Sequence, residues 1–167
     1  KKSSHKSQFE KINQIILEEK KINKLSYRNF QLRVMNSKKN IRYFIQNHNK
    51  KDIFGYGAST KGNVILNFCK IDNQMIKYIC DGNEFKHEKY TPGSHIKIIS
   101  KEKMRLSNPK YLIVLIWSFR KEVIIQEERF INKGGKLIFP LPIFHIVDKE
   151  NYKDYLKSNF DIFEFAT

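Results

Sequence analysis

The chain has 167 residues, which suits one domain or one domain with an appendage, and its 40% hydrophobic content is enough for a buried core. The sequence contains no apolar run of about 18 residues, and its polar, lysine-rich N-terminus lacks the apolar segment of a signal peptide, so we expect a cytoplasmic protein without a membrane partner. The net charge of +15 suggests nucleic acid as a partner, but scattered lysines far outnumber arginines, which favours a basic surface for an anionic ligand such as a nucleotide diphosphate.

The first fifty residues indicate a helical arm. Apolar residues recur there at roughly helical spacing in two segments, neither of which contains Gly or Pro. The spacing is set by Phe9, Ile12, Ile15, Ile16 and Ile22 in the first segment and by Phe30, Val34, Ile41, Phe44 and Ile45 in the second. We expect residues 1–50 to form a helical arm or linker that packs on an upstream domain or on a partner subunit, a second copy of the chain included.

From about residue 51, short apolar runs alternate with amphipathic segments, as in a doubly wound sheet. Strands are predicted at residues 53–54, 75–80, 96–99, 111–116 and 136–139, and helices at 61–70 and 119–133. Right-handed crossovers then favour a Rossmann-like parallel sheet of about five strands in the order 3-2-1-4-5. The sequence therefore predicts an α/β domain over residues 51–148 and a tail over 149–167, which holds a short polar helix and an aromatic segment from Phe160 to Phe165.

Two cysteines, Cys69 and Cys80, are too few and too far apart for a Cys-x-x-Cys metal or redox motif. Both lie in apolar surroundings, so we expect buried, reduced thiols, in keeping with a cytoplasmic compartment. The sequence also shows no metal-ligand spacing and no arrangement of nucleophile, base and acid. We therefore predict neither a metal site nor a catalytic residue in this chain.

The segment most informative about function is the octapeptide of residues 55–62, Gly-Tyr-Gly-Ala-Ser-Thr-Lys-Gly, which lies between a predicted strand and a predicted helix. Backbone N–H groups in such a turn can bind an anion. Gly57 would let the backbone approach a ligand, and Ser59, Thr60 and Lys61 could donate to a diphosphate. The pattern is neither the dinucleotide fingerprint nor the phosphate loop that ends in GK[ST], so a purely structural turn is the alternative.

Other polar and aromatic residues are expected at the carboxyl edge of the same sheet, where ligands of such folds bind. Asp81 follows the second strand and could accept hydrogen bonds from ribose hydroxyls or cap the next turn. Trp117 follows the fourth strand and could stack on a base or a sugar, or only cover the core. In residues 86–95, a Pro92-Gly93 turn is expected at this edge, where Tyr90, Thr91 and His95 would line the cleft. A lone histidine such as His95 is more typical of hydrogen bonding than of catalysis.

Taken in chain order, these segments resemble a known family. The resemblance rests on the octapeptide 55–62, Asn67-Phe68-Cys69, Asp81 with Asn83, Lys86, Tyr90-Thr91-Pro92-Gly93-Ser94-His95-Ile96, Trp117-Ser118-Phe119, Gly134-Gly135-Lys136 and Pro140-Leu141-Pro142. Over roughly residues 25–147 the chain is similar to the C-terminal domain of S-adenosylmethionine-dependent nucleotide-sugar C-methyltransferases. Ser118, Glu88 and Lys97 depart from the pattern, which usually has Asn, Gly and Pro there.

The resemblance implies a three-part enzyme that transfers a methyl group to a sugar carbon beside a keto group. Zinc and S-adenosylmethionine would bind upstream domains and not this one, and the base that removes the proton would also lie upstream. This domain would hold the nucleotide-diphosphate sugar and contact the methyltransferase domain, in the same or another chain.

The expected binding residues have three roles. Gly57, Ala58, Ser59 and Lys61, with Gly55 before them, would hold the diphosphate; Asp81 and Asn83 would face the nucleoside or the partner domain; Tyr90, Thr91, His95 and Trp117 would line the sugar side. Three alternatives remain open: a nicotinamide-dependent oxidoreductase, a non-catalytic interaction module that has kept the fold, and a nucleic-acid-binding protein.

Overall fold

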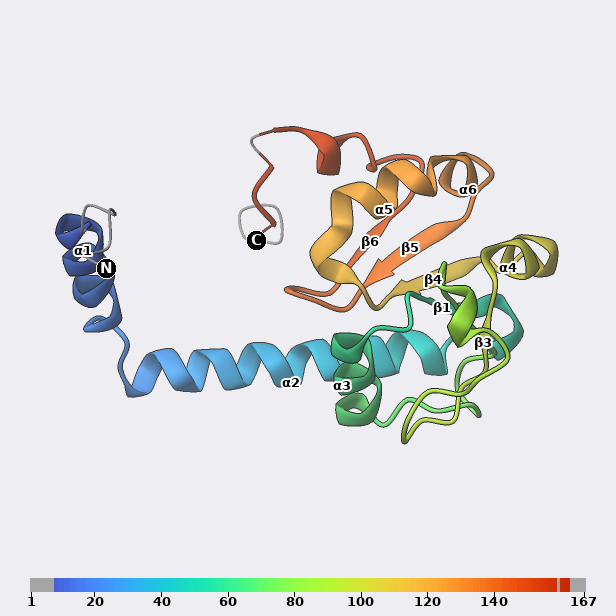
Figure 1. Ribbon diagram of the computed structural model, residues 1–167, viewed down its shortest axis with the longest axis horizontal. Coiled ribbons are helices and arrows are strands. Elements are labelled where there is room, and N and C mark those ends of the chain that lie inside the picture. The colour runs from blue at the N-terminus through green and yellow to red at the C-terminus, as the bar shows by residue number, and fades with distance from the viewer. Residues whose placement is uncertain (1–7, 159, 163–167) are drawn as a thin grey trace, which may run out of the picture. The chain divides into compact units, whose positions relative to one another are not determined.

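The structure is a computed structural model that describes residues 8–158 and 160–162. Its contacts group the chain into two units, residues 1–35 and 36–167. In the part of the chain that is described, no helix has both the length and the apolar character needed to span a membrane. Figure 1 shows the helices and the sheet of the second unit and the helices of the first.

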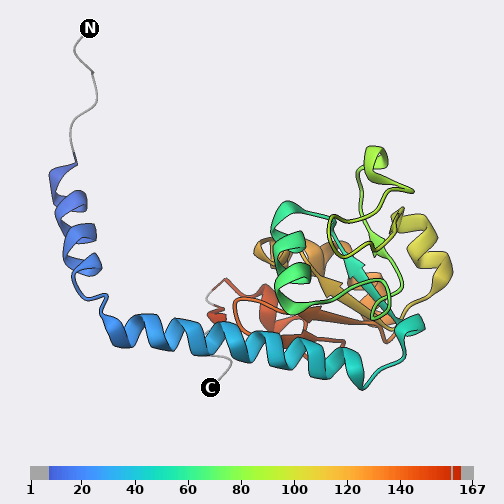
Figure 2. The ribbon, with the colours of Figure 1, turned by 90° about the horizontal axis from the view of Figure 1, so that it is seen from below.

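The first unit is helical, as the spacing of its apolar residues predicts. It contains α1 (Phe9–Glu19) and the beginning of α2 (Lys24–Gln46), which runs on into the second unit. Figure 2 shows the chain turning between these two helices. All the residues of α1 are exposed, including Phe9, at 70%, and Leu17, at 60%. The described residues of α1 therefore present apolar side chains on an exposed helix surface.

The second unit is built around a six-stranded sheet. The strands are β1 (Ile53–Tyr56), β2 (Ile79–Cys80), β3 (Ile98–Ile99), β4 (Tyr111–Val114), β5 (Lys136–Phe139) and β6 (His145–Val147). Their order is β3-β2-β1-β4-β5-β6, and the first five are parallel, which confirms the predicted fold class and the predicted order of those strands. The sequence reading did not include β6, which returns antiparallel to β5 after the turn at residues 140–144.

Helices cover both faces of this sheet. They are α3 (Thr60–Cys69), α4 (Lys101–Ser107), α5 (Arg120–Gln126) and α6 (Glu128–Asn132), with 3-10 turns η1 (Lys50–Asp52), η2 (Glu84–Lys86), η3 (Trp117–Phe119) and η4 (Asp154–Leu156). The predicted helix over residues 119–133 is thus divided at Glu127, and α4 was not predicted. The signals for α4 are its caps: the Ser100 hydroxyl accepts from the Lys103 amide, and Asn108 ends the helix in the left-handed conformation.

The strands alternate their side chains between two separate cores. One core contains Ile41, Phe44 and Ile45 of α2, Ile65 and Leu66 of α3, and the inward residues Ile53 and Ile113 of the sheet. The other contains Met104 of α4, Val123, Ile124 and Ile131 of α5 and α6, and Phe54 and Leu112 on the opposite side of the same strands. Figure 1 shows α3 and the pair α5 and α6 on different sides of the sheet.

The segment predicted as a tail packs on the second of these cores. Tyr152, Tyr155 and Ile162 are buried there. Their burial adds apolar area to a core that the five parallel strands and their helices would otherwise leave partly open. The rest of the predicted aromatic segment, residues 163–165, lies outside the described residues.

Candidate functional site

The parallel register brings three chain segments to the carboxyl edge of the sheet. Tyr56 at the end of β1 is aligned with Cys80 of β2 on one side and with Val114 of β4 on the other. The residues that follow these strands are therefore neighbours, which brings Gly57, Asp81 and the segment that leads to Trp117 together, as predicted. The break in strand order between β1 and β4 is where ligands of open α/β sheets bind.

The glycines of the octapeptide are required by packing. Gly57 has a φ of 87°, which a side chain rarely adopts, and a Cβ there would lie 2.6 Å from Ile116 Cγ2. A Cβ on Gly55 would lie 2.7 Å from Ile79 Cγ1 of β2. Ser59 is the N-cap of α3, because its hydroxyl accepts from the Gly62 amide at 3.0 Å. These contacts account for the two glycines and for Ser59 without a ligand.

The carboxylate of Asp81 lies against the glycine turn. The Ala58 amide donates to Asp81 Oδ2 at 2.8 Å, and the Asn83 amide donates to Oδ1 at 2.8 Å. The Lys86 ammonium lies 3.2 Å from Oδ2 and also donates to the Ala58 carbonyl at 2.9 Å. Asp81 therefore caps the turn that follows it, which is one of its two predicted roles. Its carboxylate also occupies the Ala58 amide, which would otherwise be a donor for the anion of a ligand.

Most other amides of the turn are also bonded within the protein. The Gly57 amide donates to the Cys80 carbonyl at 2.8 Å, and the Ser59 amide donates to the Gly57 carbonyl at 3.0 Å. Within the described residues, the amides of Thr60 and Lys61 have no such partner, because they begin α3. The first turn of this ten-residue helix thus keeps two donors and the positive end of its dipole for an anion.

Trp117 lies near the side chain of Lys61. Its ring centroid is 6.0 Å from Lys61 Nζ, and the ring is half-buried between the two cores. Beside it, a hollow of about 450 Å³ follows the carboxyl ends of β4 and β5. Ser118, Arg120, Lys121 and Pro142 help to line this hollow. Sequence reasoning did not identify Arg120 and Lys121, although both follow the Trp-Ser-Phe motif directly.

The loop with Tyr90, Thr91 and His95 lies at the other end of the sheet. Tyr90 bridges antiparallel to Lys97, just before β3, so the turn between them projects from the amino end of that strand. The Thr91 hydroxyl lies 2.6 Å from the Ser94 hydroxyl and accepts from the Ile96 amide at 2.9 Å. The expectation that the Pro92-Gly93 turn lies at the carboxyl edge was wrong, because the chain runs back past β3 before it enters this strand.

A contact with the end of α3 confirms that the Pro92-Gly93 turn lies at the amino edge of the sheet. The Asn67 side chain donates to the Pro92 carbonyl at 3.1 Å. Helix α3 begins at the carboxyl edge and ends at the opposite edge. His95 is exposed there, with a φ of 51°. The structure therefore does not bring Tyr90, Thr91 and His95 together with the glycine turn.

Two of the departures from the family pattern contact each other. Glu88 has a φ of 61°, a conformation in which glycine is more usual. Its carboxylate forms ion pairs with Lys97 at 2.5 Å and with Lys103 at 3.3 Å, and these pairs lower the pKa of Glu88 below its ordinary value. Glu88 thus faces lysines beside β3 and does not face the glycine turn.

The cysteines are buried and free, as predicted. Burial raises the pKa of the Cys80 thiol to about 12, so it is not a nucleophile at neutral pH. Among residues 8–158 and 160–162, no group of three or more His, Cys, Asp or Glu side chains is arranged to hold a metal ion.

Comparison with known proteins identifies the family. The model of the C-methyltransferase C-terminal domain matches residues 1–142. The C-methyltransferase NovU of Streptomyces niveus is 36% identical over 101 residues, which are 60% of this chain and 24% of NovU. The chain thus spans about a quarter of the length of this relative. Because the family model covers most of the chain, the resemblance inferred from its motifs is confirmed: the chain belongs to the family of C-methyltransferase C-terminal domains.

Proposed function

We propose that this domain binds a nucleotide-diphosphate sugar for an S-adenosylmethionine-dependent C-methyltransferase. Methyl transfer to a carbon beside a keto group would take place in a methyltransferase domain that also binds the cofactor and zinc. The proposal rests on one observation. Helix α3 begins with two free amides at the break in strand order of a C-methyltransferase C-terminal domain, and the ammonium of its Lys61 lies 6.0 Å from the Trp117 ring centroid.

The diphosphate is assigned to the beginning of α3. The amides of Thr60 and Lys61 would donate to one phosphate, and the flexible ammonium of Lys61 would reach the other. The Ala58 amide would take no part while Asp81 accepts from it. This is a narrower set of donors than the whole glycine turn, and it places the anion on the β4 side of the turn.

The organic part of the substrate is assigned to Trp117 and the hollow beside it. An indole face offers stacking area to a base or apolar contact to a sugar. Arg120, Lys121 and Glu122 on the hollow together give it an excess of positive charge near the diphosphate. These residues bind and orient the substrate, and none is assigned to proton transfer.

Calorimetry with UDP-hexose and dTDP-hexose tests this proposal on the full chain. Lys61→Ala should weaken binding by about tenfold, the usual loss for one charge-assisted hydrogen bond. Lys70→Ala, at the other end of α3, is the matched control and should bind as the wild type does. Equal affinities of the wild type and Lys61→Ala would refute the role of Lys61.

One observation favours a second candidate, an interaction module that has kept the fold. The Asp81 carboxylate already occupies part of the turn, and Asp81 and Lys86 largely neutralise each other. If the wild type shows no heat with either nucleotide sugar but binds a separately produced methyltransferase domain, this second function replaces the first.

A further inference from the structure

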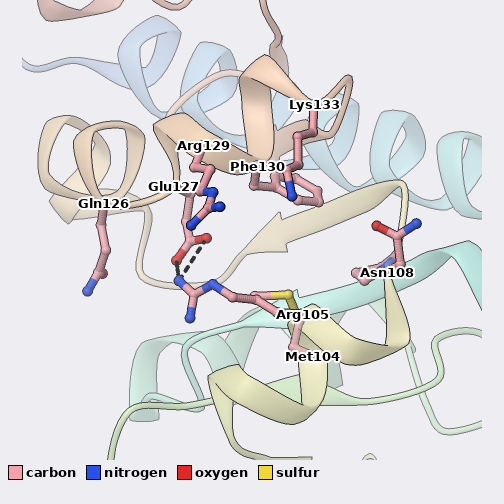
Figure 3. A pocket seen from close by; sticks show the side chains of 9 residues that line it. Met104, Arg105, Asn108, Gln126, Glu127, Arg129, Phe130 and Lys133 are labelled. Carbon is pink, nitrogen blue, oxygen red and sulfur yellow. Dashed lines mark hydrogen bonds and ion pairs between the residues drawn. The ribbon is translucent and has the colours of Figure 1, made fainter.

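A second hollow lies on the opposite face of the sheet from α3. It has a volume of about 490 Å³ and is bounded by α4 on one side and by α6 with the residues around it on the other. Figure 3 shows Arg105 and Asn108 on the α4 side and Arg129 and Lys133 on the other side, all around the same space. Met104 and the ring of Phe130 add apolar wall. This volume is within the range of small-molecule sites.

The positive charges around this hollow are only partly compensated. Arg105 pairs with Glu127, whose Oε1 lies 3.1 Å from the guanidinium, as the dashed lines in Figure 3 mark. Glu127 also accepts from the Tyr56 hydroxyl at 2.9 Å and is 1% exposed, so this carboxylate is already fully engaged. In the described part of the chain, neither Arg129 nor Lys133 forms an ion pair with an acid. Two cations one helical turn apart repel each other, and an anion between them would remove that cost.

The neighbouring acid Glu128 does not pair with these cations. Glu128 is next to Arg129 in sequence, but its carboxylate accepts from the Tyr152 hydroxyl at 3.0 Å. The hollow therefore presents an arginine fork and an ammonium, with Asn108 opposite them. An arginine fork matches the paired oxygens of a phosphate, and lysine adds a point charge.

From this arrangement we infer that the hollow between α4 and α6 binds a small molecule that carries phosphate groups. Arg129 and Lys133 hold the phosphate, Arg105 keeps its bond to Glu127, and Phe130 contacts the organic part. The inference does not rest on the proposed function, because this site and the beginning of α3 lie on different faces of the sheet.

Titration of the full chain with inorganic pyrophosphate, followed by amide NMR, tests the inference. The amides of residues 104–108 and 126–133 should shift, and Arg129→Ala/Lys133→Ala should weaken this binding at least about tenfold, since each charged hydrogen bond is worth that much. Both side chains are exposed, so the double variant should fold. Lys20→Ala/Lys21→Ala removes the same charge from exposed positions outside the hollow and should bind as the wild type does.

The outcomes separate this site from the glycine turn. In Lys61→Ala, shifts at residues 57–62 should be lost while those around the hollow persist. The inference is overturned if the amides around the hollow do not shift in the wild type, or if the two double variants lose affinity equally, which would indicate only general attraction to a basic chain.

Discussion

His145 should make the stability of the α/β unit depend on pH between about 6.5 and 4. Its ring is stacked between Phe139, with centroids 4.9 Å apart, and Tyr155, with centroids 5.2 Å apart. Nδ1 bonds to the Ile143 carbonyl at 2.7 Å, and Nε2 is buried without a partner among the described residues. Burial, reinforced by the charge of Arg120, lowers the pKa of His145 from 6.5 to about 4.

The sign of the effect follows from this shift. Below about pH 6.5 His145 is protonated in the unfolded chain, whereas in the folded chain it is protonated only below about pH 4. The free energy of unfolding therefore falls as the pH falls through this interval. A pKa difference of about 2.5 corresponds to about 3 kcal/mol in full, and about 2 kcal/mol of it is lost by pH 5. Above about pH 6.5 the contribution is constant.

Urea unfolding at about pH 7 and pH 5 measures this loss, and His145→Phe isolates it. Phenylalanine keeps the aromatic stack but has no proton to gain. At pH 7 the free energy of unfolding of the variant should be about 1–3 kcal/mol lower than that of the wild type, because the Ile143 carbonyl loses its donor. Between pH 7 and pH 5, however, the free energy of unfolding should fall by about 2 kcal/mol less in the variant than in the wild type. If wild type and variant lose the same free energy of unfolding, the burial argument for His145 is wrong.

Three further outcomes follow from contacts around the site. Gly57→Ala should lower the free energy of unfolding by about 2–4 kcal/mol, because the added Cβ overpacks against Ile116 and the backbone is strained. Gly134 has a φ of 92° and open space around it, so Gly134→Ala should cost only the backbone strain, about 1–2 kcal/mol. Equal losses for the two variants in urea unfolding would contradict the packing argument. Tyr56→Phe should cost about 1–3 kcal/mol in the same assay, because Glu127 loses a buried donor, and a loss below about 0.5 kcal/mol would show that the bond is not needed. Asp81→Asn should lower the free energy of unfolding by about 1 kcal/mol, because the bonds to Ala58 and Lys86 lose the charge of the carboxylate. The same variant should bind pyrophosphate more tightly, as amide NMR shifts at residues 57–62 would show. Weaker binding there would mean that Asp81 helps the anion to bind.

The sequence was informative about the parallel strands because each is a short apolar run followed by turn chemistry. Those signals were enough for the order of β1 to β5, given the rule of right-handed crossovers. They were weak for α4, where Met104 is the only fully buried residue, and for β6, which has three residues and follows two prolines closely. Edge elements bury less apolar area, so their sequences carry less of a pattern.

Placement of the candidate site could be predicted only where a residue directly follows a strand. That rule located Gly57, Asp81 and Trp117, and it failed for Thr91 and His95, because the segment between β2 and β3 first runs back past β3 to the amino edge of the sheet. The bond from the Ala58 amide to Asp81 joins residues 23 positions apart, and no local pattern indicates it. Which amides stay free is therefore a property of the fold and not of the glycine motif.

The free amides also constrain the direction in which the proposed substrate would lie. On the β2 side of the glycine turn, the paired charges of Asp81 and Lys86 leave no net attraction for a diphosphate and place a carboxylate where it would approach. On the β4 side, Lys61 is uncompensated by any acid in the described residues, and Trp117 provides the aromatic surface beside it. A ligand held by Thr60 and Lys61 would thus extend across the end of β4 towards Ser118 and Pro142 and away from β3. The family departure at Ser118 then lies on the path of the substrate, whereas Glu88 and Lys97 do not.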